Sequence, residues 1–203
     1  MVCLENTHNI CGGVVLSPDY MRMVADLVHK YDVPLFVDGA RFFNAAVSQG
    51  VSLSTMARDV DAVSISINKG LGAPYGAMLC GSRDLIQRSR RNHRVLGSHS
   101  VHKEGIFAAA AIVALDTMYD RLDEDHERAK KLAKMLDDMP GLRVNMQTVQ
   151  TNIVRVETCN IAPTEFVGRV MDKGIGVSVL DKSSVKFVIH YGISDEDIND
   201  VVA

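Results

Sequence analysis

The sequence predicts an α/β fold, in which helices flank a mostly parallel sheet and a small α+β region follows at the carboxyl end. Three observations lead to this prediction. Short apolar runs at residues 2–4, 35–37 and 63–67 have the composition of buried strands. A helical pattern separates the first two runs, and the order strand, helix, strand implies parallel pairing. Beyond residue 140, shorter alternating runs replace this order.

The amino-terminal elements follow from caps and spacing. The run at residues 2–4 is a strand already under way at the first residue, so we expect further chain upstream. Ser17 is a helix cap and Pro18 suits the first helical turn. Apolar residues at helical spacing continue this helix through Lys30.

The middle of the chain continues the same alternation. Residues 42–60 are expected to form a loop with a short helical piece, before the strand at residues 63–67. A further strand is predicted at residues 76–81, and Ser82 then caps a helix with a basic, solvated face. Residues 103–118 form an alanine-rich helix that we expect to pack deep in the core.

The last third of the chain predicts a second, smaller domain. An amphipathic helix over residues 122–139 is broken by Pro140-Gly141, so we divide the chain into domains 1–140 and 141–203. A helix is expected from Pro163 to Lys173, and Ser194 caps a final one. Alternating runs predict strands at residues 142–146, 153–156, 177–180 and 185–189.

Composition narrows the function classes. The 203 residues are 47% hydrophobic and 23% charged, which is ordinary for a globular protein. A net charge of −3 gives no sign of a nucleic-acid partner or an anionic membrane. No apolar run has the ~20 residues that span a bilayer. The scattered cysteines at 3, 11, 80 and 159 indicate reduced, partly buried thiols of a cytoplasmic protein, and no metal site.

The candidate catalytic residue is Lys69. It follows an apolar run and precedes a glycine-rich turn, and strand ends of this kind are where α/β folds bind ligands. Desolvation there would lower the pKa of the lysine and favour the neutral amine, which attacks carbonyl groups. The alternative is a surface lysine that begins a polar turn.

A second strand end strengthens the catalytic interpretation of Lys69. The run at residues 35–37 ends in Asp38, with Arg41 shortly after. A lysine and an aspartate on neighbouring strands suit pyridoxal phosphate, because the amine holds the aldehyde carbon and the carboxylate pairs with the protonated ring nitrogen. The alternative for Asp38 is a helix cap or a turn.

Several segments together resemble threonine aldolases, which belong to the β-eliminating lyases of aminotransferase-like fold. The likeness covers nearly the whole chain in one order. The segments that carry it are Glu5-Asn6-Thr7-His8-Asn9, Gly12-Gly13, Val37-Asp38-Gly39-Ala40-Arg41, Asn44-Ala45-Ala46, Asn68-Lys69-Gly70-Leu71-Gly72-Ala73-Pro74, Leu122-Asp123-Glu124-Asp125-His126, Thr151-Asn152-Ile153-Val154 and Lys186-Phe187-Val188-Ile189-His190.

The resemblance implies a reaction and a site. Lys69 would hold pyridoxal 5'-phosphate covalently, Asp38 would pair with its ring nitrogen, and Arg41 would lie beside the ring or the substrate carboxylate. The reaction would cleave threonine or allo-threonine-like β-hydroxy amino acids to glycine and an aldehyde. His8 lies in a loop that the family places near the site, so it is a candidate substrate-binding residue, although a lone histidine in a polar turn is more often structural.

The sequence departs from the family at two further candidate substrate-binding residues. His102 stands where the family has an anion-binding arginine, in a stretch one residue longer. Lys186 stands where the family has its carboxylate-binding arginine, and lysine keeps the charge without the planar fork. The family's amino-terminal segment, with its phosphate-binding groups, has no counterpart. We therefore expect weak or absent cofactor binding by these 203 residues alone.

Three functions stay open from the sequence. The first is the threonine aldolase reaction, and the second is β-elimination or transamination by a relative of the same fold. The third is an incomplete or inactive relative that keeps a non-catalytic role. Because the family's sites lie between subunits, the resemblance also implies a homo-oligomer, either a dimer or a tetramer.

Overall fold

The structure is a computed structural model that describes residues 1–97 and 103–202. By packing, the chain divides into two compact units. The first contains Met1–Asn6 and Leu16–Asp120, and the second contains Thr7–Val15 and the chain from Arg121 onward. Each unit has its own four-stranded sheet.

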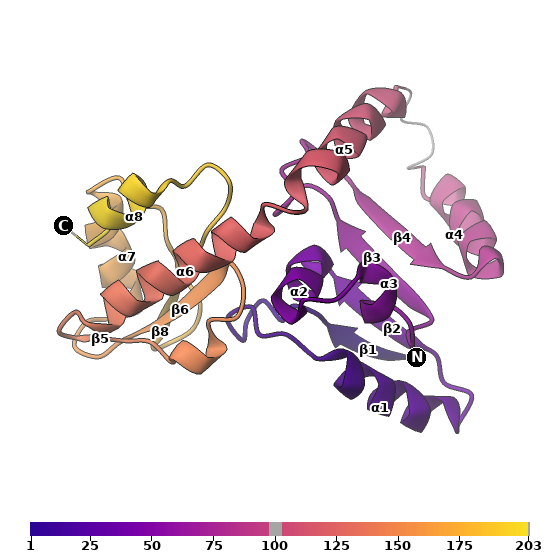
Figure 1. Cartoon of the computed structure of the whole chain (residues 1–203), viewed down its shortest axis with the longest axis horizontal. Coiled ribbons are helices and arrows are strands. Elements are labelled where there is room, and N and C mark those ends of the chain that lie inside the picture. The colour runs from indigo at the N-terminus through magenta and orange to yellow at the C-terminus, as the bar shows by residue number, and fades with distance from the viewer. Residues whose placement is uncertain (98–102, 203) are drawn as a thin grey trace. The chain divides into compact units, whose positions relative to one another are not determined.

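The sheet of the first unit is mostly parallel, as predicted. Its strands are β1 (Val2–Glu5), β2 (Leu35–Gly39), β3 (Ala62–Ser66) and β4 (Ala77–Gly81), and they lie in that order (Figure 1). The first three strands pair in parallel, whereas β4 is an antiparallel edge strand. The carboxyl ends of β1, β2 and β3 therefore meet at one edge.

The helix between β1 and β2 confirms the predicted crossover. Helix α1 spans Pro18–His29, and the Ser17 side chain caps it by accepting a hydrogen bond from the backbone N–H of Tyr20. Ala25 and Val28 of this helix pack against Leu35 of β2. Burial of this apolar stripe fixes the helix on the sheet.

The prediction of a loop after β2 is wrong over its first part. Helix α2 (Phe42–Gln49) follows the strand at once, and the short α3 (Leu53–Met56) comes after it. No side chain caps α2, so its start carries no sequence signal. The helix buries Phe42, Phe43 and three further residues, and such all-round burial leaves no amphipathic stripe to detect.

The remaining helices of the first unit are α4 (Arg83–Val95) and α5 (Glu104–Met118). Ser82 caps α4 as predicted, by accepting a hydrogen bond from the backbone N–H of Leu85. The expectation that α5 packs deep in the core is wrong for the described chain. Only Ala111 and Ala114 of this helix are buried, and apolar side chains such as Ile112 are exposed.

The second unit is α+β, as predicted. Its strands are β5 (Leu142–Arg143), β6 (Ile153–Thr158), β7 (Ser178–Val179) and β8 (Ser184–Val188), and they form an antiparallel sheet of order β5-β6-β8-β7. Its helices are α6 (Leu122–Asp137), α7 (Pro163–Met171) and α8 (Asp195–Asp200), with a 3-10 turn η2 at Met146–Thr148.

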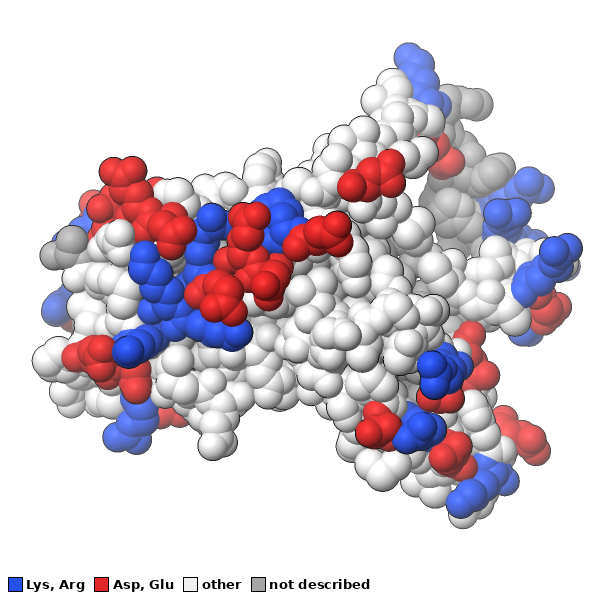
Figure 2. All heavy atoms as spheres, in the orientation of Figure 1, with Lys and Arg blue, Asp and Glu red and all other residues white. Residues whose placement is uncertain are grey.

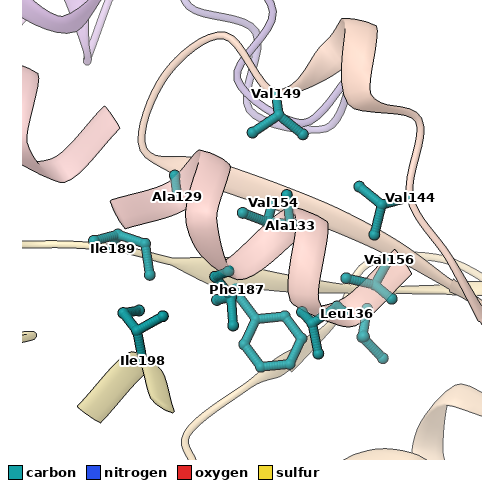
Figure 3. Close-up of a cluster of buried hydrophobic side chains, with 12 residues drawn as sticks. Ala129, Ala133, Leu136, Val144, Val149, Val154, Val156, Phe187, Ile189 and Ile198 are labelled. Carbon is teal, nitrogen blue, oxygen red and sulfur yellow. The ribbon is translucent and has the colours of Figure 1, made fainter. Parts of the chain in front are cut away.

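One face of this second sheet carries the apolar core of the unit. Leu132 and Leu136 of α6 pack with Val154 of β6, Phe187 of β8 and Ile198 of α8. Figure 3 shows these elements directing their apolar side chains toward one another. The alternating residues of β6 and β8, which include Arg155 and Lys186, therefore point to the opposite face.

The opposite face is covered by residues 7–15, which explains why this amino-terminal loop belongs to the second unit. The hydroxyl of Thr151 donates to the backbone oxygen of Gly13 at 2.8 Å. The backbone N–H of Val15 donates to the side chain of Gln150 at 2.9 Å. Gly12 and Gly13 both have positive φ, and their missing side chains let the loop approach the strand.

The boundary between the compact units lies after Asp120, whereas the sequence placed a domain boundary at residue 140. The physical reason is that α6 packs on β5 and β6, so this helix joins the second unit. The predicted domains 1–140 and 141–203, which were divided at the helix break Pro140-Gly141, stay a prediction.

The surface shows mixed charge. Figure 2 shows acidic and basic side chains interspersed on the face in view, and ion pairs such as Arg121–Asp125 and Lys131–Asp195 line α6.

Within the described residues, no helix has the length and apolar character to cross a membrane. The same residues contain no cluster of three metal-ligating side chains. All four cysteines are free and exposed, so the expected partial burial is wrong.

Candidate active site

The candidate site begins with a row of polar residues across the first sheet. Glu5 of β1 pairs with Asp38 of β2, and Asp38 pairs with Ser64 of β3. Paired residues of parallel strands present their side chains to the same face. Two carboxylates and a hydroxyl thus share one face near the carboxyl ends of the strands, where α/β folds bind ligands.

Asp38 is exposed and also shapes the turn that follows it. Its Oδ1 accepts a hydrogen bond from the backbone N–H of Ala40 at 3.1 Å. This is the turn role that the sequence left as the alternative. The bond fixes the direction of the carboxylate at the strand end, so the turn role and a ligand-binding role are compatible.

Lys69 lies in a tight turn just beyond β3. The backbone N–H of Gly72 donates to the carbonyl of Lys69 at 2.8 Å, and the N–H of Ala73 donates to the carbonyl of Ile67 at 3.1 Å. Leu71 is buried and anchors the turn, while the Lys69 side chain is exposed. The expectation that the strand end would desolvate Lys69 is therefore wrong for the described structure.

Asp38 and Lys69 follow neighbouring parallel strands, β2 and β3, at the same edge of the sheet. In the described structure they make no hydrogen bond or ion pair with each other. Half-buried Ser64 and Ser66 lie on the face of β3 that matches Asp38. Asp38 and Lys69, the two predicted cofactor-binding residues, thus lie at the same edge of one sheet but do not bond to each other.

Arg41 belongs to the same unit and precedes the first residue of α2. Its side chain is half-buried, and burial lowers the pKa of the guanidinium. The carboxylate of Glu5 opposes that change by favouring the charged form. Arg41 therefore lies close enough to Glu5 for the two charges to interact. Glu5 is the β1 member of the row of polar residues formed with Asp38 and Ser64.

A cavity of about 850 Å³ lies beside the lysine turn. Asn68, the residue before Lys69, contributes to its wall. Tyr75 and Phe107 also line it, and their rings are tilted by 56° with centroids 5.4 Å apart. His93 and Glu104 add polar groups. Asp38, Arg41 and Lys69 are not among the lining residues, so this cavity does not include the predicted cofactor-binding groups.

The second unit contains two of the predicted substrate-binding residues. The ammonium of Lys186 donates to Oδ1 of Asn9 at 3.1 Å. His8 closes the turn of the 7–15 loop, because its backbone pairs with Val14 and its Nδ1 accepts from the N–H of Cys11 at 3.3 Å. This geometry matches the structural role that the sequence left open for His8. His102 lies outside the described residues.

The structure also reveals residues that the sequence reasoning missed. Glu5 belongs to the row of polar residues because β1 pairs with β2, and a single sequence does not specify which strands pair. Arg155 lies directly opposite Lys186 across the pair β6–β8. The available signal was a charged residue inside the otherwise apolar run at 153–156, since a lone arginine in such a run points away from the core.

Comparison with known proteins connects this geometry to a family. The profile of the beta-eliminating lyase family matches residues 1–159. A low-specificity L-threonine aldolase of Arabidopsis thaliana is 34% identical over 98% of this chain and 56% of its own length. The low specificity L-threonine aldolase of Escherichia coli K12 is 36% identical over 100% of this chain and 58% of its own length. The chain thus spans little more than half the length of these relatives.

Solved structures show the same fold. A Listeria monocytogenes protein, provisionally described as an L-allo-threonine aldolase, superposes with a TM-score of 0.84 at 20% identity, over 99% of this chain and 59% of that one. Leishmania major threonine aldolase gives 0.73 at 16% identity, over 99% and 58%. The chain therefore belongs to the beta-eliminating lyase family, a family of pyridoxal phosphate-dependent enzymes with an aminotransferase-like fold.

Proposed function

We propose that this chain carries the cofactor-binding lysine and aspartate of a lyase that cleaves threonine-like β-hydroxy amino acids to glycine and an aldehyde. The observation that carries the proposal is the position of Asp38 and Lys69 at the ends of neighbouring parallel strands. The names of the Arabidopsis and Escherichia coli relatives support this substrate class.

The donor set at this edge fits the pyridoxal part of the cofactor. An exposed amine and an exposed carboxylate are present, and the N–H of Ala40 orients the carboxylate. The hydroxyls of Ser64 and Ser66 lie on the carboxylate's face and suit an anion. We therefore assign Lys69 and Asp38 to the cofactor, with Arg41 beside them.

The chemistry divides between cofactor and chain. When bound, pyridoxal phosphate withdraws the electron pair that is released as the Cα–Cβ bond breaks. The Lys69 amine would hold the aldehyde carbon of the cofactor, and the Asp38 carboxylate would pair with the protonated ring nitrogen. A base would take the β-hydroxyl proton as the Cα–Cβ bond breaks and the aldehyde leaves, and a proton added at Cα would then give glycine.

Substrate binding is the proposed role of the remaining residues. Arg41 and Lys186 carry the positive charge that a substrate carboxylate requires. His102 occupies the position of an anion-binding arginine in the resembling family. His8 is retained as a candidate through its loop, although its hydrogen bonds also explain it structurally. A homo-oligomer in the cytoplasm is part of the same proposal, and the free cysteines favour a reducing compartment.

Absorbance and reduction test the assignment of Lys69. Purified protein mixed with a large excess of pyridoxal phosphate should gain an absorbance band in the visible blue region, because a protonated carbon–nitrogen double bond to an amine absorbs at longer wavelength than the aldehyde that it replaces. Borohydride reduction followed by peptide mapping should place the label on Lys69. Lys69→Ala should abolish both signals, whereas Lys30→Ala, which removes an exposed lysine after α1, should leave them intact.

Product analysis separates the three functions. Glycine and acetaldehyde formed from threonine support the aldolase, whereas ammonia with a 2-oxo acid, or amino-group transfer to a 2-oxo acid, supports the related reactions. A label that remains in Lys69→Ala contradicts the assignment. A protein that binds no cofactor at any concentration supports the non-catalytic alternative.

A further inference from the structure

Two positive residues face each other on the second sheet. Arg155 of β6 and Lys186 of β8 are direct partners in the antiparallel register, so their Cβ atoms lie about 5 Å apart on one face. Like charges at such positions repel each other. The Asp181 carboxylate, 2.9 Å from Nη2 of Arg155, offsets part of this repulsion, and an anion placed between the two side chains would relieve more of it.

Each of the two side chains is oriented by hydrogen bonds to residues other than its facing partner. Arg155 donates from Nε to the hydroxyl of Ser184 at 3.2 Å and from Nη2 to a carboxylate oxygen of Asp181 at 2.9 Å. Lys186 donates to Asn9 at 3.1 Å. These contacts fix the guanidinium plane and the ammonium position before any ligand binds.

The Arg155 side chain retains capacity to bind more. Guanidinium carries five N–H donors, and the two hydrogen bonds above use two of them. The side chain is 35% exposed, so the sheet and the 7–15 loop do not enclose it completely. The Cβ of Arg155 lies under Gly12, where a methyl group on the glycine would come within 3.3 Å, so the 7–15 loop passes directly over the arginine.

We propose that Arg155 is a specificity-determining residue that supplies the planar fork for the substrate carboxylate, while Lys186 supplies the second positive charge. This inference rests on the proposed function, which makes Lys186 a substrate-binding residue. A guanidinium matches both oxygens of a carboxylate, whereas an ammonium acts as a point charge. Asp181 acts as a positioning residue, because its ion pair orients the guanidinium.

A compensation experiment tests the proposal in the active enzyme. Arg155→Met should raise KM for threonine about tenfold or more with kcat largely kept, because a hydrogen bond to a charged group is lost. Lys186→Arg in that background should restore most of the loss by placing a fork on the facing strand. Arg143→Met should leave KM unchanged, since Arg143 is an exposed arginine of β5 on the same face.

A binding experiment decides the inference even if the chain proves inactive. The Nε–H signals of arginine are followed by NMR while the cofactor-free protein is titrated with glycine, glycinamide or inorganic phosphate. The Arg155 signal should shift with glycine and stay in place with glycinamide, which lacks the carboxylate. A larger response to phosphate than to glycine would overturn the assignment to a carboxylate.

Two further outcomes contradict the proposal. One is an Arg155 signal that does not respond to glycine at any concentration. The other is an unchanged KM in Arg155→Met whose thermal unfolding matches that of the parent protein. If Arg155→Met fails to fold, Arg155→Lys retains the charge and removes only the fork, and it should raise KM in the same direction. Activity lost in every variant and in the parent protein counts against the proposed function alone.

Discussion

We expect a single imidazole in α6 to make the stability of the second unit depend on pH. His126 is only 2% exposed, and burial lowers its pKa from the ordinary 6.5 to about 4. The unfolded chain therefore binds a proton at a pH where the folded chain does not. The stabilising contribution is complete above the unfolded pKa and is lost progressively as the pH falls toward the folded pKa.

The expected effect is a loss of about 2 kcal/mol in the free energy of unfolding between about pH 7 and about pH 5. Urea unfolding of the parent protein and of His126→Gln at both pH values measures it. The variant should be less stable at neutral pH and should lose less stability on acidification. Carboxylates that also titrate contribute equally to both proteins, so their effect cancels when the losses of the two proteins are compared.

His93→Gln serves as the control, because this histidine of α4 is exposed. It should keep the pH dependence of the parent protein. If the parent protein and His126→Gln lose the same free energy of unfolding on acidification, the buried imidazole does not cause the loss of stability at acidic pH.

Among the elements of the second unit, the 7–15 loop is packed closely against the sheet at Gly13. A methyl group on Gly13 would lie 2.5 Å from the hydroxyl of Thr151 and 3.1 Å from Cβ of Ile153, and φ is +79°. Gly13→Ala should therefore cost about 2–4 kcal/mol, from overpacking together with backbone strain. Urea unfolding measures the loss.

Gly174→Ala is the matched control in the same unit. Its φ of +82° is nearly the same, but no atom lies within 4 Å of the added methyl group. It should cost only about 1–2 kcal/mol, from strain alone. Similar losses in the two variants would mean that the loop does not pack against β6 as the structure has it.

Most elements could be predicted from the sequence because their signals are local. Ser17, Ser82 and Ser194 each cap a helix, and Ser194 forms a full capping box with Asp197. The apolar runs became β2 and β3 as predicted. Helix α2 was missed because burial on all sides removes the periodicity and no side chain caps its start.

The candidate site was predictable in its residue types and less so in its geometry. Motif order identified Asp38 and Lys69, and the structure places them at neighbouring strand ends. The sequence could not show that Lys69 is exposed, because burial depends on everything that packs around the turn. Arg155 escaped notice because facing pairs arise from register, and register is a property of two distant segments.

At the scale of the whole molecule, the exposed apolar surface of α5 needs an explanation. Ile106, Ile112 and Val113 are 67%, 60% and 61% exposed on one helix, and Phe107 on the same helix is 39% exposed. Single exposed apolar residues are ordinary, but a run of them on one element indicates a contact surface. We propose that a second copy of this chain covers this surface.

We therefore expect the protein to self-associate, and Ile112→Lys to shift it toward the monomer. A lysine placed in an apolar contact loses hydration that no partner replaces, so even one substitution should weaken association about tenfold or more. Sedimentation velocity over a range of concentrations measures the change. Met23→Lys is the matched control, because Met23 is 62% exposed on α1, away from the α5 surface. If Met23→Lys dissociates the oligomer as strongly, or the parent protein is monomeric at every concentration, α5 is not the contact surface between copies.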